Sequence, residues 1–471
     1  SEALLRALFE APLGAAPTTE AERAAHTLLA ELRQRVPEAA GEAFAWQLYE
    51  LWEANDAPSK QKWLLHALAH FGGDATVARL TPLIRKWPGE SQHQRAVLGL
   101  DLLRAIGSDA ALSAIAGIAQ KLKYRALKQR ASECLDQIAC ARGLSADELA
   151  DRLVPECGLD AQGQRSFDYG PRQFAFVLSP ELVPMARGAD GKLRKAPPKP
   201  GKSDDEALAP AALSEWRAFR KQVKDALAIQ VDRLEQAMVS GRRWPLADWE
   251  RLLRAHPLLR HVVPSLLWAA YDEAGAPRPF RVTPGALLDA AGAPVELDEG
   301  ARVGVIHALE LEPAEREAWN DRWDELGLLA PFPQLDREVL APSADELKGD
   351  SLRELAGADT SPSQLRGSLI RAGWTRGAPQ DAGILCEHLK YFASADLTAI
   401  AIHEGLSVSG GDDRWTQFAR LERCLFLRGL HAPGDVAWFE GEGVPLREVP
   451  ALVLSEVLRD MQAIARRAAE G

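Results

Sequence analysis

One short stretch of the sequence concentrates side chains that could bind a ligand or move a proton. It holds an arginine between Gly373 and Gly377, with a tryptophan close by. A guanidinium next to an indole ring can hold an anion or stack on a planar ligand, because it is always charged and donates in a flat fork. The candidate residues of this stretch are Trp374, Arg376, Asp381, Glu387, His388 and Lys390.

Glu387 and His388 are the members of this group best suited to acid–base chemistry. They are neighbours in a run that predicts a strand, and neighbours on a strand point to opposite faces, so we do not expect them to act together. The stretch has two interpretations: the site of an enzyme of unknown class, or a turn with a packed tryptophan and an arginine–aspartate pair. We favour the turn, because ion-paired turns are more common than active sites.

His66 and His70 are the candidates for a metal site. They are four residues apart in a predicted helix, a spacing that can place two imidazoles on one ion. Ala67 stands where the metalloprotease motif requires glutamate, and no third ligand is visible. The two histidines align with Asp101 and Ala105 of a later helix, which indicates an exposed flank. We therefore predict no metal.

A third group of candidates is basic and surrounds a predicted hairpin and the helix after it. Clustered Lys and Arg could contact nucleic-acid phosphates. Asp204, Asp205 and Glu206 interrupt the cluster, and the net charge of −11 weighs against general affinity for nucleic acid or acidic membranes. We expect a solvated surface, with nucleic-acid binding as the alternative. The candidates are Arg194, Lys195, Arg217, Arg220, Lys221 and Lys224.

No motif predicts a cofactor. The sequence has no Gly-x-x-x-x-Gly-Lys-Ser phosphate loop, dinucleotide fingerprint or Gly-x-Ser-x-Gly elbow. The 5 cysteines are odd in number and form no Cys-x-x-Cys pair, so we expect reduced thiols and a cytoplasmic location. No apolar run approaches the roughly 18 residues of a membrane span, and residues 1–18 lack the pattern of a signal peptide.

The first third of the chain predicts short helices with a repeat of thirty-five residues. Asp74 and Asp109 are expected to cap the second helix of each copy, and a weaker third copy contains Leu135 and Ile138. The matched pairs are Leu65 and Leu100, Leu68 and Leu103, Phe71 and Ile106, Gly72 and Gly107, Val77 and Leu112, Leu80 and Ile115, and Leu83 and Ile118.

Helix pairs of this length cannot bury their apolar faces alone, so we expect the copies to stack into a HEAT-like α-solenoid. Such arrays present an extended surface that generally binds another macromolecule. The hypothesis for function is therefore a non-catalytic adaptor or regulatory scaffold that binds a protein partner. In the plainer alternative, the array only supports the domain that follows it.

Beyond residue 155 the pattern is mixed and predicts an α+β fold. We expect three regions: the repeat array over 1–155, a hairpin, long helix and mixed region over 156–345, and an α+β subdomain over 346–471. The predicted strands are 173–178, 182–187, 193–196, 280–282, 295–297, 303–309, 384–392, 397–403, 424–428 and 436–439. The predicted helices are 211–240, 313–326, 362–372 and 449–468, with further short helices over 258–270.

A family resemblance covers roughly residues 155–465. The residues that carry it are Asp168–Gly170, Gly241–Trp244, His256–Leu259, Phe280–Val282, Pro331–Leu335, Gly373–Trp374, Arg376–Gly377 and Ser455–Asp460. With these, the chain resembles a bacterial family called MolR-like, a large domain of unknown function often joined to WGR modules. No Trp-Gly-Arg triplet occurs in this chain.

The resemblance implies little chemistry, because the MolR-like family brings no established activity. Helical repeats ahead of the large domain are also typical of that family. Its members resemble components encoded beside MoxR-type ATPases and von Willebrand A-type proteins. The resemblance therefore implies an adaptor with a partner from such a system.

Overall fold

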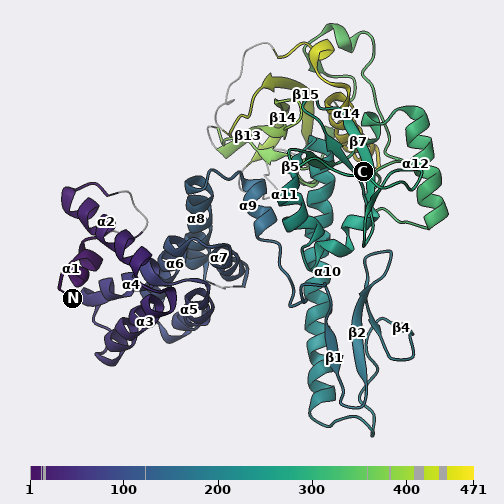
Figure 1. The fold of residues 1–471 in the computed structure, drawn as a ribbon. Helices are drawn as coiled ribbons and strands as arrows, with labels where there is room; N and C mark the ends of the chain where they lie inside the picture. The colour runs from purple at the N-terminus through teal and green to yellow at the C-terminus, as the bar shows by residue number, and fades with distance from the viewer. Residues whose placement is uncertain are drawn as a thin grey trace. The chain divides into compact units, whose positions relative to one another are not determined.

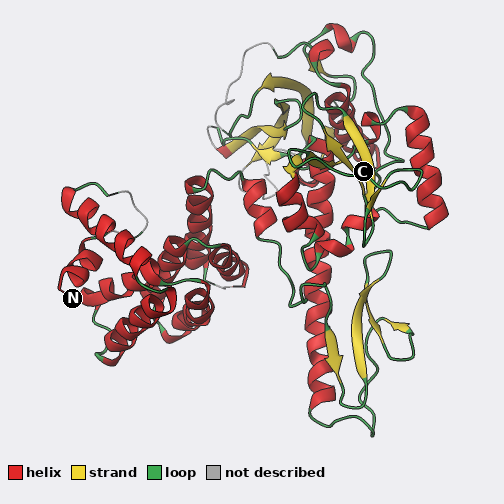
Figure 2. Cartoon of the chain, in the orientation of Figure 1, coloured by secondary structure: helices red, strands yellow, loops and turns green. Residues whose placement is uncertain are grey.

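A computed structural model describes residues 2–11, 13, 17–121, 124–357, 359–380, 383–407, 418–433 and 443–470. The chain is a mixed α+β protein in which helices are combined with small antiparallel sheets (Figure 2). It divides into two compact units, Ser1–Pro155 and Glu156–Gly471. Over the described ranges, every helix is too short or too polar to cross a bilayer.

The first unit consists of helices joined by short turns (Figure 1). Local signals set several helix ends; Thr19 and Glu22, for example, form a capping box at the start of α2. The helices are α1 (Glu2–Glu10), α2 (Glu20–Arg35), α3 (Glu38–Ala54), α4 (His66–Phe71), α5 (Asp74–Lys86), α6 (His93–Ile106), α7 (Asp109–Lys121), α8 (Arg125–Ala141) and α9 (Ala146–Arg152).

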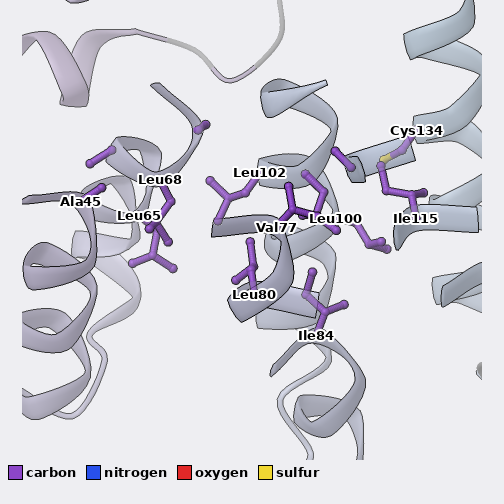
Figure 3. Packing of buried hydrophobic residues seen from close by; sticks show 14 of the residues in the cluster. Ala45, Leu65, Leu68, Val77, Leu80, Ile84, Leu100, Leu102, Ile115 and Cys134 are labelled. Carbon is purple, nitrogen blue, oxygen red and sulfur yellow. The ribbon is translucent and has the colours of Figure 1, made fainter. Parts of the chain in front are cut away.

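The matched apolar positions of the sequence lie in one continuous core. Leu65 and its counterpart Leu100 are both buried (Figure 3), and so are Val77 and Leu112. Helix α6 packs against α4 and α5 and also against α7 and α8, while α5 packs against α7. The pair α4 and α5 therefore packs against the pair α6 and α7, and α6 packs in turn against α8.

Two predicted details of the repeat are wrong. Asp74 and Asp109 are the first helical residues and not the caps, which are the preceding Gly73 and Ser108. The aspartates instead accept hydrogen bonds from the next copy, Asp74 from Ser108 Oγ at 2.6 Å and Asp109 from Arg142 Nη1 at 2.8 Å. An acidic residue in the first turn also complements the helix dipole.

The second unit begins with a four-stranded sheet that packs along a long helix. The strands β1 (Ser166–Asp168), β2 (Gln173–Leu178), β3 (Pro184–Arg187) and β4 (Leu193–Arg194) pair in that order beside α10 (Leu208–Ser240) (Figure 1). Trp216 and Phe219 of α10 are buried, with the ring of Trp216 5.0 Å from that of Phe167 and the ring of Phe219 5.1 Å from that of Phe176. Aromatic packing therefore attaches the sheet to the helix.

The middle sheet has the order β5-β9-β6-β7-β8. Its strands are β5 (Arg243–Pro245), β6 (Leu267–Tyr271), β7 (Pro277–Val282), β8 (Leu287–Leu288) and β9 (Arg302–Val305), with α11 (Leu246–Trp249) after β5 and α12 (Pro313–Leu326) after β9. The short helices predicted over 258–270 are wrong at the end of that range, because its last residues belong to β6, the central strand of this sheet, which is buried at every position. The predicted strand at 295–297 is not formed, and Pro294 makes only an isolated bridge.

The last sheet has the order β10-β15-β14-β13-β12, and β11 also pairs with β15. The strands are β10 (Ser351–Leu352), β11 (Asp359–Thr360), β12 (Thr375–Arg376), β13 (Ile384–Phe392), β14 (Leu397–Ser407) and β15 (Ala419–Arg428); the helices are α13 (Pro362–Arg371) and α14 (Ala451–Glu470). Helix α13 packs on β14, β15 and α14. The strand predicted at 436–439 lies outside the described residues.

Candidate functional site

Trp374 and Lys390 meet at a carboxylate that the sequence did not single out, that of Asp460 on α14. Trp374 Nε1 and Lys390 Nζ each donate to Asp460 Oδ2 at 2.8 Å. Both donors are buried, with 3% and 5% of their surface exposed. Burial raises the pKa of Asp460, although Lys390 and Trp374 partly offset this. In the sequence, Asp460 was noted only as the last residue of the family motif Ser455–Asp460, and not as a candidate site residue.

Two other candidates of this stretch do not join the carboxylate. Arg376 is exposed on the edge strand β12, where its backbone pairs opposite His388. Glu387 is buried beside Gly377, whose missing side chain leaves room for its carboxyl group, and Gln380 Nε2 approaches its Oε2 at 3.4 Å. Burial raises the pKa of Glu387. Asp381 lies outside the described residues.

His388 pairs with a second buried histidine, His403 of β14. Their atoms Nδ1 and Nε2 lie 2.8 Å apart. Burial lowers the pKa of His388 to about 4 and that of His403 to about 3, so one neutral ring donates to the other at pH 7. The outer ring nitrogens, His388 Nε2 and His403 Nδ1, have no hydrogen-bond partner in the described part of the chain. Over the same residues, no group of three His, Cys, Asp or Glu could hold a metal.

Asp460 also lines a pocket of about 320 Å³ between α13 and α14. Three arginines line this pocket: one is the last residue of α13, and two lie on α14. Asp460 connects this pocket to the candidate stretch, because it accepts hydrogen bonds from Trp374 and Lys390. The polar lining residues are Glu338, Ser368, Arg371, Arg459, Asp460, Gln462 and Arg466.

A buried ionic network lies next to this pocket. Arg337 binds Glu456 through two hydrogen bonds of 2.7 Å and Glu235 of α10 through a third of 2.7 Å. His307 Nδ1 accepts from the Leu309 amide, so Nε2 carries the hydrogen and donates to Glu456 at 3.0 Å. Burial would raise the pKa of Glu456, but Arg337 and His307 outweigh it and hold the pKa well below its usual range.

The two metal candidates, His66 and His70, are half-buried, so the prediction of an exposed flank is wrong. His66 Nδ1 lies 3.3 Å from the Leu8 carbonyl oxygen, and the ring of His70 lies 6.1 Å from that of His26. Burial lowers the pKa of both histidines, that of His70 to about 4. Helices α1 and α2 cover a flank that the repeat alignment treated as open.

The six basic candidates lie on the β3–β4 hairpin and on α10. Two are neutralised locally, since Arg194 pairs with Asp190 and Lys221 with Asp225, each at 2.5 Å. Lys195, Arg217 and Lys224 are exposed, and Arg220 is half-buried. Nothing in these contacts favours a nucleic-acid interface over a solvated surface.

Comparisons with known proteins give no activity. Residues 191–374 match the family model for a domain of unknown function, DUF4132. The chain is 36% identical over 340 residues to the uncharacterized protein YehI of Escherichia coli (strain K12). The match covers 71% of this chain but 28% of that relative, so the chain spans less than a third of the length of the curated protein it matches. No solved structure gives a significant match. The chain therefore contains a domain of unknown function that is also found in bacteria.

Proposed function

We propose that this protein is a non-catalytic, cytoplasmic interaction adaptor whose first unit is a HEAT-like solenoid that binds a protein partner. The observation that carries the proposal is the bonding between successive helix pairs: Asp74 accepts from Ser108, and Asp109 accepts from Arg142. Asp74 and Asp109, which are equivalent positions of the repeat, thus each make a polar contact to the next copy, and the copies share one apolar core. Repeat arrays of this kind use their extended surfaces to bind macromolecules.

The second unit supports an adaptor over an enzyme. Within the candidate stretch, Trp374 and Lys390 are hydrogen-bonded to Asp460, and His388 is hydrogen-bonded to His403. Side chains that hold each other in the core stabilise the fold and are not presented to a substrate. An enzyme of unknown class with its site around Trp374–Lys390 is the alternative, and it requires one of these pairs to open.

We place the partner surface on α3 and α5. There Arg79 and Glu50 form an exposed ion pair at 2.8 Å, and the Arg79 guanidinium lies 3.8 Å from the centre of the Trp46 ring. Arg95 of the neighbouring α6 similarly lies 4.7 Å from the centre of the Trp52 ring of α3. Stacking on buried rings fixes these charged groups before a partner arrives, which lowers the entropy cost of binding.

The partner class follows from the MolR-like resemblance. That resemblance makes a MoxR-type ATPase or a von Willebrand A-type protein the first candidate. The experiment is affinity purification of the full chain from its native cell, with partners identified by mass spectrometry and then tested by titration with purified components.

Arg79→Glu is the test variant and Arg23→Glu, on the exposed side of α2, is its matched control. We expect Arg79→Glu to weaken partner binding at least about tenfold, because the reversed charge would face a group of like charge on the partner. Arg23→Glu should leave partner binding unchanged. Equal binding by both variants, with unchanged thermal unfolding, would count against this surface. Failure of any partner to co-purify in a stoichiometric amount would count against the adaptor.

A further inference from the structure

The pocket between α13 and α14 gathers three guanidinium groups from two helices. Arg371 is the last residue of α13, and Arg459 and Arg466 lie on α14. The two α14 arginines are seven residues apart, which is close to two turns of about 3.6 residues each, so they share one face of the helix. Asp460 and Glu338 are the carboxylates of the same pocket.

The carboxylates of the pocket do not neutralise these arginines. Asp460 receives hydrogen bonds from Lys390 and Trp374, both through Oδ2. The Lys390 ammonium group, 2.8 Å away, therefore already neutralises the negative charge of Asp460. Glu338 makes only a loose pair with Arg466, at 3.5 Å, and both side chains are largely exposed.

The charges of the remaining two arginines are neutralised even less. Arg459 lies 4.0 Å from an oxygen of Glu235 and 4.0 Å from one of Glu456, beyond hydrogen-bond distance. Arg337 binds both of those carboxylates at 2.7 Å and so holds their charge more closely. Arg371 is exposed and makes no ion pair with any residue that the structure describes. The pocket is left with an excess of positive charge.

We propose that this pocket binds a phosphate-type oxyanion carried by a small molecule. Guanidinium groups bind phosphate through paired N–H donors, and three of them match the charge of a dianion better than that of a monocarboxylate. The volume of about 320 Å³ lies at the lower end of the range for small-molecule sites, about 300–1,000 Å³, so a phosphorylated metabolite fits and a folded domain does not. The site is independent of the partner surface on α3 and α5.

The first experiment titrates the full chain with sodium phosphate at pH 7 and follows heat of binding and thermal unfolding. Sodium chloride and sodium acetate at the same ionic strength separate a specific site from screening and from general carboxylate binding. We expect saturable binding of phosphate, with a rise in Tm that chloride and acetate do not reproduce. The same change in Tm with all three salts would overturn the proposal.

The second experiment uses Arg371→Gln, because Arg371 holds no ion pair that folding needs, with Arg187→Gln on the exposed end of β3 as the control. Loss of a charged hydrogen-bond donor should weaken phosphate binding at least about tenfold, while the control binds as the natural chain does. The Tm without phosphate should be the same in all three proteins. Undiminished binding by Arg371→Gln, or by Arg371→Gln combined with Arg466→Gln, would show that phosphate binds elsewhere and would refute the site.

Discussion

Arg337 and Glu456 form a two-point ion pair in the interior of the second unit, although they are 119 positions apart in the chain. Both bonds are 2.7 Å long, from Nε to Oε1 and from Nη2 to Oε2. The side chains are 3% and 1% exposed. The pair joins the loop after α12 to α14, and Glu235 and His307 connect it to α10 and to the loop after β9.

Removing one partner of this pair should be costly. In Glu456→Gln the amide cannot match the buried charge of Arg337, so we expect the free energy of unfolding to fall by about 3 kcal/mol. Urea denaturation, with hydrogen exchange of the α14 amides as the local probe, measures the loss. Glu338→Gln, at a half-exposed site on the same loop, is the control and should change stability by less than about 1 kcal/mol. A change of the same size in both variants would show that the pair has no special role.

The same carboxylate predicts a loss of stability in acid. The pKa of Glu456 is held far below its ordinary 4.5, so below pH 4.5 the unfolded chain binds a proton that the folded chain resists. The stabilising contribution is therefore complete above pH 4.5 and disappears as the pH falls toward the depressed pKa. The stability difference between the natural chain and Glu456→Gln should shrink over this range, as urea denaturation at several pH values would measure. A difference that stays constant down to about pH 2.5 would contradict this assignment.

The His388–His403 pair predicts a second pH dependence at higher pH. Burial lowers both pKa values, to about 4 and about 3, from the ordinary 6.5, and Arg366 near both rings also disfavours their charged forms. Between pH 6.5 and about 4.5 only the unfolded chain takes up these protons. The free energy of unfolding therefore decreases as the pH is lowered, by up to about 1.4 kcal/mol per pH unit for each histidine. The double variant His388→Leu/His403→Leu should flatten this slope in chemical denaturation. An unchanged slope would mean that other groups cause it.

Gly377 should not tolerate a side chain. A Cβ atom there would lie 2.5 Å from Cγ and 2.5 Å from Oε1 of Glu387, whose side chain is buried. We expect Gly377→Ala to lower the free energy of unfolding by about 1–3 kcal/mol, the usual range for an overpacked site. Gly300→Ala is the matched control, because nothing lies within 4 Å of the added atom. Equal Tm values for the two variants would show that β12 can move away from β13.

Local sequence patterns determined much of the secondary structure. The long helix predicted over 211–240 is formed within α10, and its buried Trp216 and Phe219 pack on the first sheet. The boundaries of β13 and of α12 were also predictable, because alternation or helical periodicity within one element depends only on near neighbours. The helical prediction for the residues that form β6 was wrong. An apolar run beside a proline fits a helix or a central strand equally well until its neighbours are known.

The sequence by itself also showed that Trp374, Arg376 and Lys390 lie in one short stretch of side chains that could bind a ligand or move a proton. Only the tertiary structure decided that Trp374 and Lys390 share Asp460 while Arg376 faces solvent. The physical reason is range: helix and strand periodicity is set by residues a few positions apart, whereas the partner of a buried charge is set by which distant elements pack together. Lys390 is 70 positions from Asp460, and no local pattern connects them.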